Sequence, residues 1–134
     1  MEPQLASTKV LIVDDSMIVR RAIRKAVTAA GVHDDGIREA PNGEEAIGAL
    51  DDEPVDVVFL DINMPVMGGE EFMEAMDAAG RANDQFIIIV STEVNAKRLL
   101  KMATLGARGR LKKPFEPERL QKLIADAVRE KSAS

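Results

Sequence analysis

The sequence predicts an α/β fold in which five parallel strands form one sheet and helices cover both of its faces. Short apolar runs alternate with amphipathic stretches at helical spacing along the whole chain, as this architecture requires. The chain has 134 residues, 46% of them hydrophobic, so it can fill one core but not a second domain of ordinary size. We expect a single domain at 8–131, a flexible N-terminal extension at 1–7 and a C-terminal tail at 132–134.

The first predicted strand spans 9–13 and leads into an amphipathic helix. Ser16 is expected to be the N-cap of this helix, because a Ser hydroxyl accepts a hydrogen bond from a free amide of the first turn. Gly31 is expected to end it, since Gly adopts the left-handed conformation that often follows a helix. The apolar face is expected to consist of Ile18, Ala22, Ile23, Ala26, Val27 and Ala30. The opposite side carries Arg20, Arg21, Arg24 and Lys25.

Two further strands are predicted on either side of a second helix. The first of them is short and spans 37–40. Asn42, with Glu45 three residues later, predicts a capped helix that runs through Leu50. The next strand, 55–60, is mostly apolar, which indicates a strand buried on both faces.

A third helix is predicted at 69–79, where Gly80 stops it. The apolar run 86–90 predicts the fourth strand. The helix after it is expected from about 95 to 105, and Gly106 closes it.

A brief fifth strand at 110–112 and a long helix complete the domain. Pro117 is favoured at the first position of a helix, where its missing amide costs nothing, and Glu116 precedes it as the cap. The apolar face of the last helix is expected to consist of Leu120, Leu123, Ile124, Ala127 and Val128.

Polar side chains stand where three of the predicted strands end. Asp14 and Asp15 follow the first strand, Asp61 follows the third, and Ser91 and Thr92 follow the fourth. Polar groups at the carboxyl ends of parallel strands converge on one crevice. Three carboxylates with neither His nor Cys beside them form an oxygen-only site, which suits Mg²⁺, and Mn²⁺ can take its place.

Five short motifs occur in order along the chain. They are Val13-Asp14-Asp15, Asp61, Met64-Pro65 with Gly68-Gly69, Ser91-Thr92 and Lys113-Pro114-Phe115. In this order the chain resembles the receiver domain of two-component response regulators, in its stand-alone, CheY-like form. The resemblance covers about 8–131, nearly the whole chain. It implies a flavodoxin-like (βα)5 fold.

The resemblance also implies a phosphoacceptor and a metal site. Asp61 would attack a phosphohistidine on a partner, a histidine kinase or phosphotransfer protein, and become an aspartyl phosphate. Asp15, Asp61 and the backbone carbonyl of Asn63 would bind Mg²⁺ directly, and Asp14 would act largely through a coordinated water. The cation would offset the repulsion between the carboxylates and neutralise the incoming phosphoryl oxygens.

In the family, the lysine before a proline at the end of the last strand points into the site. The resemblance therefore assigns this role to Lys113, with a cis peptide bond to Pro114, and pairs its ammonium with Asp61 and then with the phosphoryl group. Lys112 would point to the other face of the strand. Ser91 would supply the hydroxyl that binds a phosphoryl oxygen. Without the other motifs, each of these residues would be an ordinary loop or cap residue.

Two positions depart from the family pattern. Receivers that switch in the familiar way have Tyr or Phe in the fifth strand, where this chain has Arg110. Signalling would then need another movement of the loop around Ser91. Thr92 occupies a place that a smaller residue usually holds, and we expect it to narrow access to the aspartate. Asn63, Thr92 and Glu93 are the candidates that tune the lifetime of the phosphoryl group.

We expect the chain to be a single-domain response regulator that signals by phosphorylation-dependent protein binding. It would not be an enzyme, although it would catalyse its own phosphorylation and dephosphorylation. A phosphorelay intermediate or phosphate sink would need no aromatic switch and stays an alternative. A Mg²⁺-dependent phosphohydrolase is less favoured, because it needs a second carboxylate two residues after Asp61, where Asn63 stands. The intact acidic triad and Lys113 oppose a purely structural role.

The net charge and the distribution of charged residues along the chain indicate which kinds of partner the protein can bind. A net charge of −5 opposes non-specific binding to nucleic acid, and the absence of a signal peptide or of an apolar run of about 18 residues predicts a cytoplasmic protein without a membrane anchor. Residues 34–84 contain fifteen acids and two bases, whereas 94–115 contain seven bases and no acid. Either the positive stretch docks an acidic partner protein, or these charges only keep the protein soluble. We expect a monomer, and we expect the one histidine, His33, on the surface.

Overall fold

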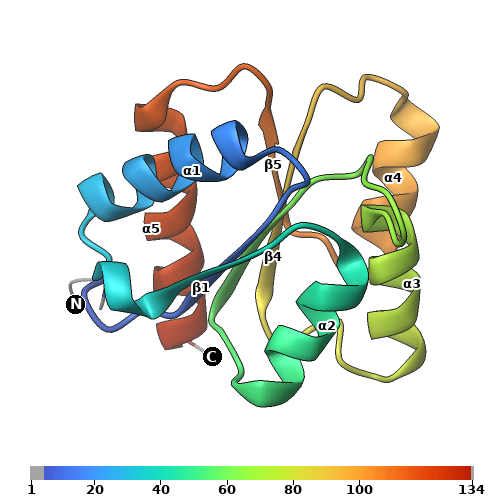
Figure 1. Cartoon of the computed structure of the whole chain (residues 1–134), viewed down its shortest axis with the longest axis horizontal. Helices are drawn as coiled ribbons and strands as arrows, with labels where there is room; N and C mark the ends of the chain where they lie inside the picture. Colours follow the sequence, from blue (N-terminus) through green and yellow to red (C-terminus); the bar gives the residue numbers. More distant parts are fainter. Residues whose placement is uncertain (1–4, 134) are drawn as a thin grey trace.

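The structure, a computed structural model, describes the backbone of residues 5–133 and the side chains of 5–131. Within this part of the chain, five parallel strands form one sheet in the order β2-β1-β3-β4-β5 (Figure 1). The strands are β1 (Val10–Val13), β2 (Ile37–Ala40), β3 (Val57–Leu60), β4 (Phe86–Ser91) and β5 (Gly109–Lys112). The chain adds β2 on one side of β1 and the later strands on the other. The sheet therefore has a switch point between β1 and β3, where ligands bind in open α/β folds.

Helices alternate with the strands and lie on both faces of the sheet (Figure 1). They are α1 (Met17–Ala30), α2 (Gly43–Asp52), α3 (Gly69–Ala78), α4 (Ala96–Thr104) and α5 (Pro117–Ala133). Helices α1 and α5 cover one face, and α2, α3 and α4 cover the other. The predicted fold class, a flavodoxin-like sheet of five parallel strands with helices on both sides, is confirmed.

Strands β1, β2, β3 and β4 each contribute to two separate cores, because successive side chains of a strand point to opposite faces, whereas β5 contributes Leu111 to one of them. In β1, Val10 and Ile12 pack in the cluster beneath α1 and α5, whereas Leu11 and Val13 pack in the cluster beneath α2, α3 and α4. All four side chains are fully or almost fully buried. The inner strands β1, β3 and β4 therefore read as nearly continuous apolar runs, and they hold the residues at their carboxyl ends in fixed positions, whereas the edge strands β2 and β5 contain charged residues.

The predicted caps of the first two helices are present. The Ser16 hydroxyl accepts a hydrogen bond from the Val19 amide at 3.2 Å, and Asn42 accepts one from the Glu45 amide at 2.9 Å. Gly31 ends α1 with φ of 118°, in the left-handed region that favours Gly. Helix α2 continues two residues beyond the predicted end, and β3 begins two residues later than predicted.

The predicted apolar face of α1 is wrong at its N-terminal end. Ile18 is 80% exposed and Ala22 is exposed as well. The physical reason is that this side of α1 is uncovered as far as Ala29, whereas Ile23, Ala26 and Val27 lie on the covered side of the helix. Ile18 and Ala22 instead line an open groove with Phe115 and Pro117, and the volume of this groove is about 550 Å³.

Some segments outside the strands and helices also differ from expectation. A 3₁₀ turn, Asp34–Gly36, replaces part of the loop predicted before β2, and His33 is exposed beside it as expected. Leu5, in the predicted N-terminal extension, packs against the core under α1, whereas residues 1–4 lie outside the described residues. Helix α5 takes in two residues of the predicted tail, and Ser134 lies outside the described residues. No helix in the described part of the chain is long and apolar enough to cross a membrane.

Candidate functional site

The register of the sheet brings Asp14 and Asp61 to the same level. Val13 pairs with Leu60 at the ends of β1 and β3, so the aspartates that follow them leave the sheet side by side. The Asp61 amide donates a hydrogen bond to the Val13 carbonyl oxygen at 2.9 Å, which continues the ladder by one residue. The backbone that carries both carboxylates is therefore part of the rigid sheet.

Three carboxylates gather at this edge of the sheet. One oxygen from each of Asp14, Asp15 and Asp61 lies within 4.8 Å of the other two. Asp14 and Asp61 are buried, with 1% and 6% exposure, whereas Asp15 is exposed. Opposite ligands of an octahedral Mg²⁺ ion are about 4 Å apart, given Mg–O distances of about 2.1 Å. The three oxygens therefore need only a small adjustment to bind Mg²⁺, and a set of hard oxygen donors suits this ion.

Lys113 is the cation nearest to this cluster. Its Nζ lies 2.8 Å from Asp14 Oδ2 and 3.5 Å from Asp61 Oδ1. The peptide bond between Lys113 and Pro114 is cis. Lys112, one residue earlier, is exposed. One ammonium group therefore contacts two of the three carboxylates, which leaves the cluster with a net negative charge that a divalent cation would neutralise.

The protonation of Asp61 reflects its crowded surroundings. Burial raises the pKa of the Asp61 carboxyl above its ordinary value, and the charge of Asp14 raises it further. The Lys113 ammonium and the hydrogen bond that the Ile62 amide donates to Asp61 Oδ1 at 2.8 Å act in the opposite direction but do not outweigh burial. A cation at the cluster would favour the ionised carboxylate, which is the form that can act as a nucleophile.

Ser91 ends the neighbouring strand, β4, and its side chain is buried. Its Oγ accepts a hydrogen bond from the Glu93 amide at 2.7 Å, and its carbonyl oxygen accepts one from the Lys113 amide at 3.0 Å. Thr92 is exposed beside it, and Asn63 is exposed in the loop after β3. The structure therefore brings Asp14, Asp15, Asp61 and Lys113 together. The Ser91 hydroxyl lies at the next strand end, bonded to its own loop.

Arg110 has a contact that the sequence did not suggest. Its Nη2 donates a short hydrogen bond to the carbonyl oxygen of Glu93, so β5 is linked to the loop after Ser91. Its Nε is buried and is without a hydrogen-bond partner among the described residues. The Glu93 carboxylate also pairs with Arg98 at 2.9 Å. The residue at the expected aromatic position therefore holds this loop by a polar contact.

Sequence reasoning also missed Arg20, which it placed among the bases on the outer side of the first helix. Arg20 Nη1 donates a hydrogen bond to the Asp14 carbonyl oxygen at 2.7 Å. The available signal was its position four residues after the N-cap Ser16, which puts it one turn above the loop that contains Asp14 and Asp15. Its partner on β2, Glu39, could only be found once the strand order was known.

The model of the response regulator receiver domain family matches residues 10–125. This chain belongs to the receiver domain family. As a receiver domain it is 36% identical over 121 residues to a protein of Campylobacter jejuni named "Chemotaxis protein CheY homolog", with 90% of this chain and 92% of that protein covered. It is 32% identical over 117 residues to chemotaxis protein CheY1 of Helicobacter pylori, with 87% and 93% covered.

Solved structures agree with this assignment. The structure of chemotaxis protein CheY4 of Vibrio cholerae matches with a TM-score of 0.80 and 33% identity, over 90% of this chain and 98% of that one. The resemblance to stand-alone, CheY-like receivers of two-component signalling is therefore confirmed. Receiver domains are signalling regulators that interact with histidine kinases and downstream targets, and they typically bind Mg²⁺ through an acidic cluster such as this one.

Proposed function

We propose that this receiver domain accepts a phosphoryl group on Asp61 from the phosphohistidine of a histidine kinase or phosphotransfer protein, and that it then signals by binding another protein. The observation that carries the proposal is the set of groups around Asp61. Two further carboxylates and the Lys113 ammonium surround it at the switch point of the sheet. This set contains a nucleophile, the donors for a hard cation and a positive charge for the phosphoryl oxygens.

In the transfer step, one Asp61 carboxylate oxygen bonds to phosphorus while the bond between phosphorus and the donor's imidazole nitrogen breaks. The imidazole leaves with the electron pair of that bond, takes up a proton and becomes neutral histidine. Mg²⁺, when bound, neutralises charge on the phosphoryl oxygens. Asp14, Asp15, Asp61 and the Asn63 carbonyl would hold it.

Lys113 would change partners during this step. Its ammonium lies 3.5 Å from Asp61 Oδ1 before transfer, so a phosphoryl group on that carboxylate would come within its reach. The Ser91 hydroxyl would donate to another phosphoryl oxygen. In dephosphorylation, water would attack phosphorus while the bond between phosphorus and the Asp61 oxygen breaks, which releases inorganic phosphate and the free carboxylate. Asn63, Thr92 and Glu93 are the candidates nearest in sequence to the two site loops that would tune the approach of this water.

The groove beside the site supports a protein as the phosphoryl donor. It is lined by apolar side chains of α1, among them Ile18 and Ala22, and by Phe115 and Pro117, and it begins at Lys113. Exposed apolar surface next to a reactive carboxylate is costly in water and gains free energy when a partner covers it. Because histidine kinases take their phosphoryl group from ATP, we propose that the protein acts in the cytoplasm.

The downstream partner is proposed to be a protein with an acidic surface, but only part of the positive stretch is available to it. Lys101 Nζ lies 3.4 Å from Glu70 and 3.5 Å from Glu74, and Arg108 pairs with Glu130 at 2.9 Å. Lys97 and Lys112 are exposed, so we assign the contact with an acidic partner to them. A phosphorelay intermediate or phosphate sink is the second candidate, and Arg110 at the aromatic position is the observation that favours it.

The test is to incubate the protein with a small acyl phosphate and Mg²⁺, or with a phosphorylated kinase, and to measure its intact mass. The wild-type chain should gain one phosphoryl group, and Asp61→Asn should gain none. Asp52→Asn, which changes an exposed aspartate at the end of α2, is the matched control and should behave as wild type. Undiminished phosphate incorporation by Asp61→Asn would rule out the assignment.

A further inference from the structure

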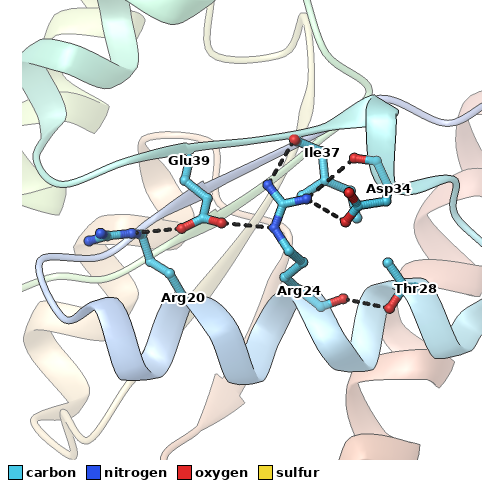
Figure 2. A network of polar contacts seen from close by, with 6 residues as sticks. All are labelled: Arg20, Arg24, Thr28, Asp34, Ile37 and Glu39. Carbon is cyan, nitrogen blue, oxygen red and sulfur yellow. Dashed lines mark hydrogen bonds and ion pairs between the residues drawn. The ribbon is translucent and has the colours of Figure 1, made fainter.

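Arg20 connects the acidic cluster to the edge of the sheet. Its guanidinium donates from Nη1 to the Asp14 carbonyl oxygen at 2.7 Å and from Nε to Glu39 Oε1 at 2.9 Å. Figure 2 shows the second of these contacts, with Arg20 reaching from α1 to Glu39 on β2. The Arg20 side chain is only 15% exposed, so water competes weakly for these contacts.

Glu39 holds the guanidinium of Arg20 in one orientation. Its other oxygen, Oε2, accepts from Arg24 Nε at 2.8 Å, and Arg24 also bonds to Asp34 and to the Ile37 carbonyl oxygen (Figure 2). Partial burial opposes ionisation of Glu39, but the hydrogen bonds from Arg24 and Arg20 outweigh it and lower the pKa of the Glu39 carboxyl. Glu39 is therefore a charged anchor for Arg20.

The carbonyl oxygen that Arg20 holds belongs to the peptide bond between Asp14 and Asp15. This peptide unit is planar from one Cα atom to the next, so a fixed oxygen also fixes the amide and Cα of Asp15. The Asp14 carboxylate has contacts of its own, with the Ser16 amide at 2.9 Å and Lys113 at 2.8 Å. Asp15 is exposed, and its position depends on the backbone that carries it.

We propose that Arg20 is a positioning residue, anchored by Glu39, which holds the Asp15 carboxylate in place for a divalent cation through the peptide bond between Asp14 and Asp15. The inference rests on the proposed function, because it concerns the metal site that would assist phosphorylation of Asp61. Removal of a group that orients a metal ligand typically lowers metal affinity by about 10- to 100-fold.

The first test is a titration of the full chain with Mg²⁺ alone, followed by the chemical shifts of backbone amides. Arg20→Ala should weaken Mg²⁺ binding on the order of tenfold, the lower end of the effect of such orienting groups. Arg24→Ala is the matched control. It removes the other arginine bonded to Glu39 but no contact with Asp14, so its Mg²⁺ affinity should stay near that of wild type. Arg20→Lys, which keeps the charge, should recover part of the affinity.

The second test needs no metal. With a chelator present, the amides of Asp15 and Ser16 should exchange with deuterium faster in Arg20→Ala than in wild type or Arg24→Ala. A merely structural role of the network would change both arginine variants alike. Should Arg20→Ala fail to fold, Glu39→Gln keeps Arg20 and removes the charge of its anchor, and it should weaken Mg²⁺ binding by a smaller factor than that expected for Arg20→Ala.

Three results would overturn the inference: wild-type Mg²⁺ affinity in Arg20→Ala, an equal loss in Arg24→Ala, or, where Arg20→Ala does not fold, wild-type affinity in Glu39→Gln. Phosphorylation of the same proteins by an acyl phosphate separates this failure from that of the proposed function. If wild type binds Mg²⁺ but Asp61 is not phosphorylated, the proposed function fails and the Mg²⁺ titration still tests Arg20. If Asp61 is phosphorylated and Arg20→Ala binds Mg²⁺ normally, only the role of Arg20 fails.

Discussion

The two loops that border Asp61 are held in different ways. The loop after β1, at 14–16, is bonded to three other elements: the Asp14 amide donates to Ala40 at the end of β2 at 3.1 Å, and Arg20 of α1 and Lys113 after β5 also bond to Asp14. The loop after β4, at 92–95, is held mainly through one residue, Glu93, which bonds within the loop and to the end of β4, and also to Arg98 of α4 and Arg110 of β5. Glu93 donates to Ser91 Oγ and accepts from the Asn95 amide. Val94 in this loop is 73% exposed.

This difference separates a preorganised side of the site from a responsive one. Contacts spread over a whole loop resist local opening, whereas a loop held mainly through one residue can rearrange with the loss of fewer contacts. The first loop is therefore suited to hold carboxylates for a cation. In the second, the Ser91 hydroxyl would have to turn from Glu93 to a phosphoryl oxygen, and Arg110, bonded to the Glu93 carbonyl, would be the first residue of β5 to respond.

Of the changes that test this comparison, a substitution of Lys113 is expected to have the largest effect, on the rate of phosphorylation. Lys113→Ala removes the ammonium that faces Asp14 and Asp61, and the phosphoryl oxygens lose a preorganised positive charge. Phosphorylation by an acyl phosphate at saturating Mg²⁺ should slow on the order of a hundredfold, as when one such group is removed from an active site. Lys112→Ala, at the exposed neighbouring lysine, should leave the initial rate near that of wild type. Similar rates in both variants would contradict the role of Lys113.

The next effect concerns the metal in the first loop. If Mg²⁺ binds only the folded chain, a concentration of 100 times Kd stabilises it by about 2.7 kcal/mol. Asp15→Asn should lose most of this gain, because the variant keeps the size of the side chain but removes one of three charges from the cluster. Thermal melts with and without Mg²⁺ measure the difference, with Asp52→Asn as control. An equal response in Asp15→Asn and wild type would remove Asp15 from the metal site.

The smallest effect is expected at Thr92 in the second loop. If its exposed side chain narrows the approach to Asp61, Thr92→Ala should speed phosphorylation by small donors, or hydrolysis, by about threefold, which corresponds to roughly 0.6 kcal/mol of barrier. The decay of the phosphorylated protein and its rate of formation are the two measurements. Unchanged rates in both would mean that Thr92 does not gate access to the site.

The sequence predicted the sheet well because local patterns determine it. An apolar run such as 86–90 can only be buried on both faces, and a polar residue directly after it must lie at the edge of the sheet. The approach of Lys113 to Asp61 came from family resemblance, and its shorter contact, with Asp14 across 99 residues of sequence, was not predicted at all. Contacts of that kind depend on how elements pack.

The wrong or incomplete predictions also concern contacts that depend on how elements pack. Periodicity assigned Ile18 to the buried face of α1, but how much of that face is covered depends on how α5 and the segment before it pack against α1. Arg20 was assigned to the solvent side because helical spacing does not reveal that β2, with Glu39, lies beside α1. For Arg110, the sequence showed only that an aromatic residue of the family pattern is missing. It did not show the bond of Arg110 to the Glu93 carbonyl oxygen.

The central claim, that the first loop serves the metal and the second responds to phosphorylation, is tested most directly by amide hydrogen exchange in three states. These are the protein with a chelator, with Mg²⁺, and with Mg²⁺ and an acyl phosphate. Mg²⁺ alone should slow exchange at 14–16 and leave 91–95 unchanged, and phosphorylation should then change exchange at 91–95. In Arg110→Ala the change at 91–95 should persist but no longer reach β5. A phosphorylation-dependent change confined to 14–16, with 91–95 unaffected, would contradict the account.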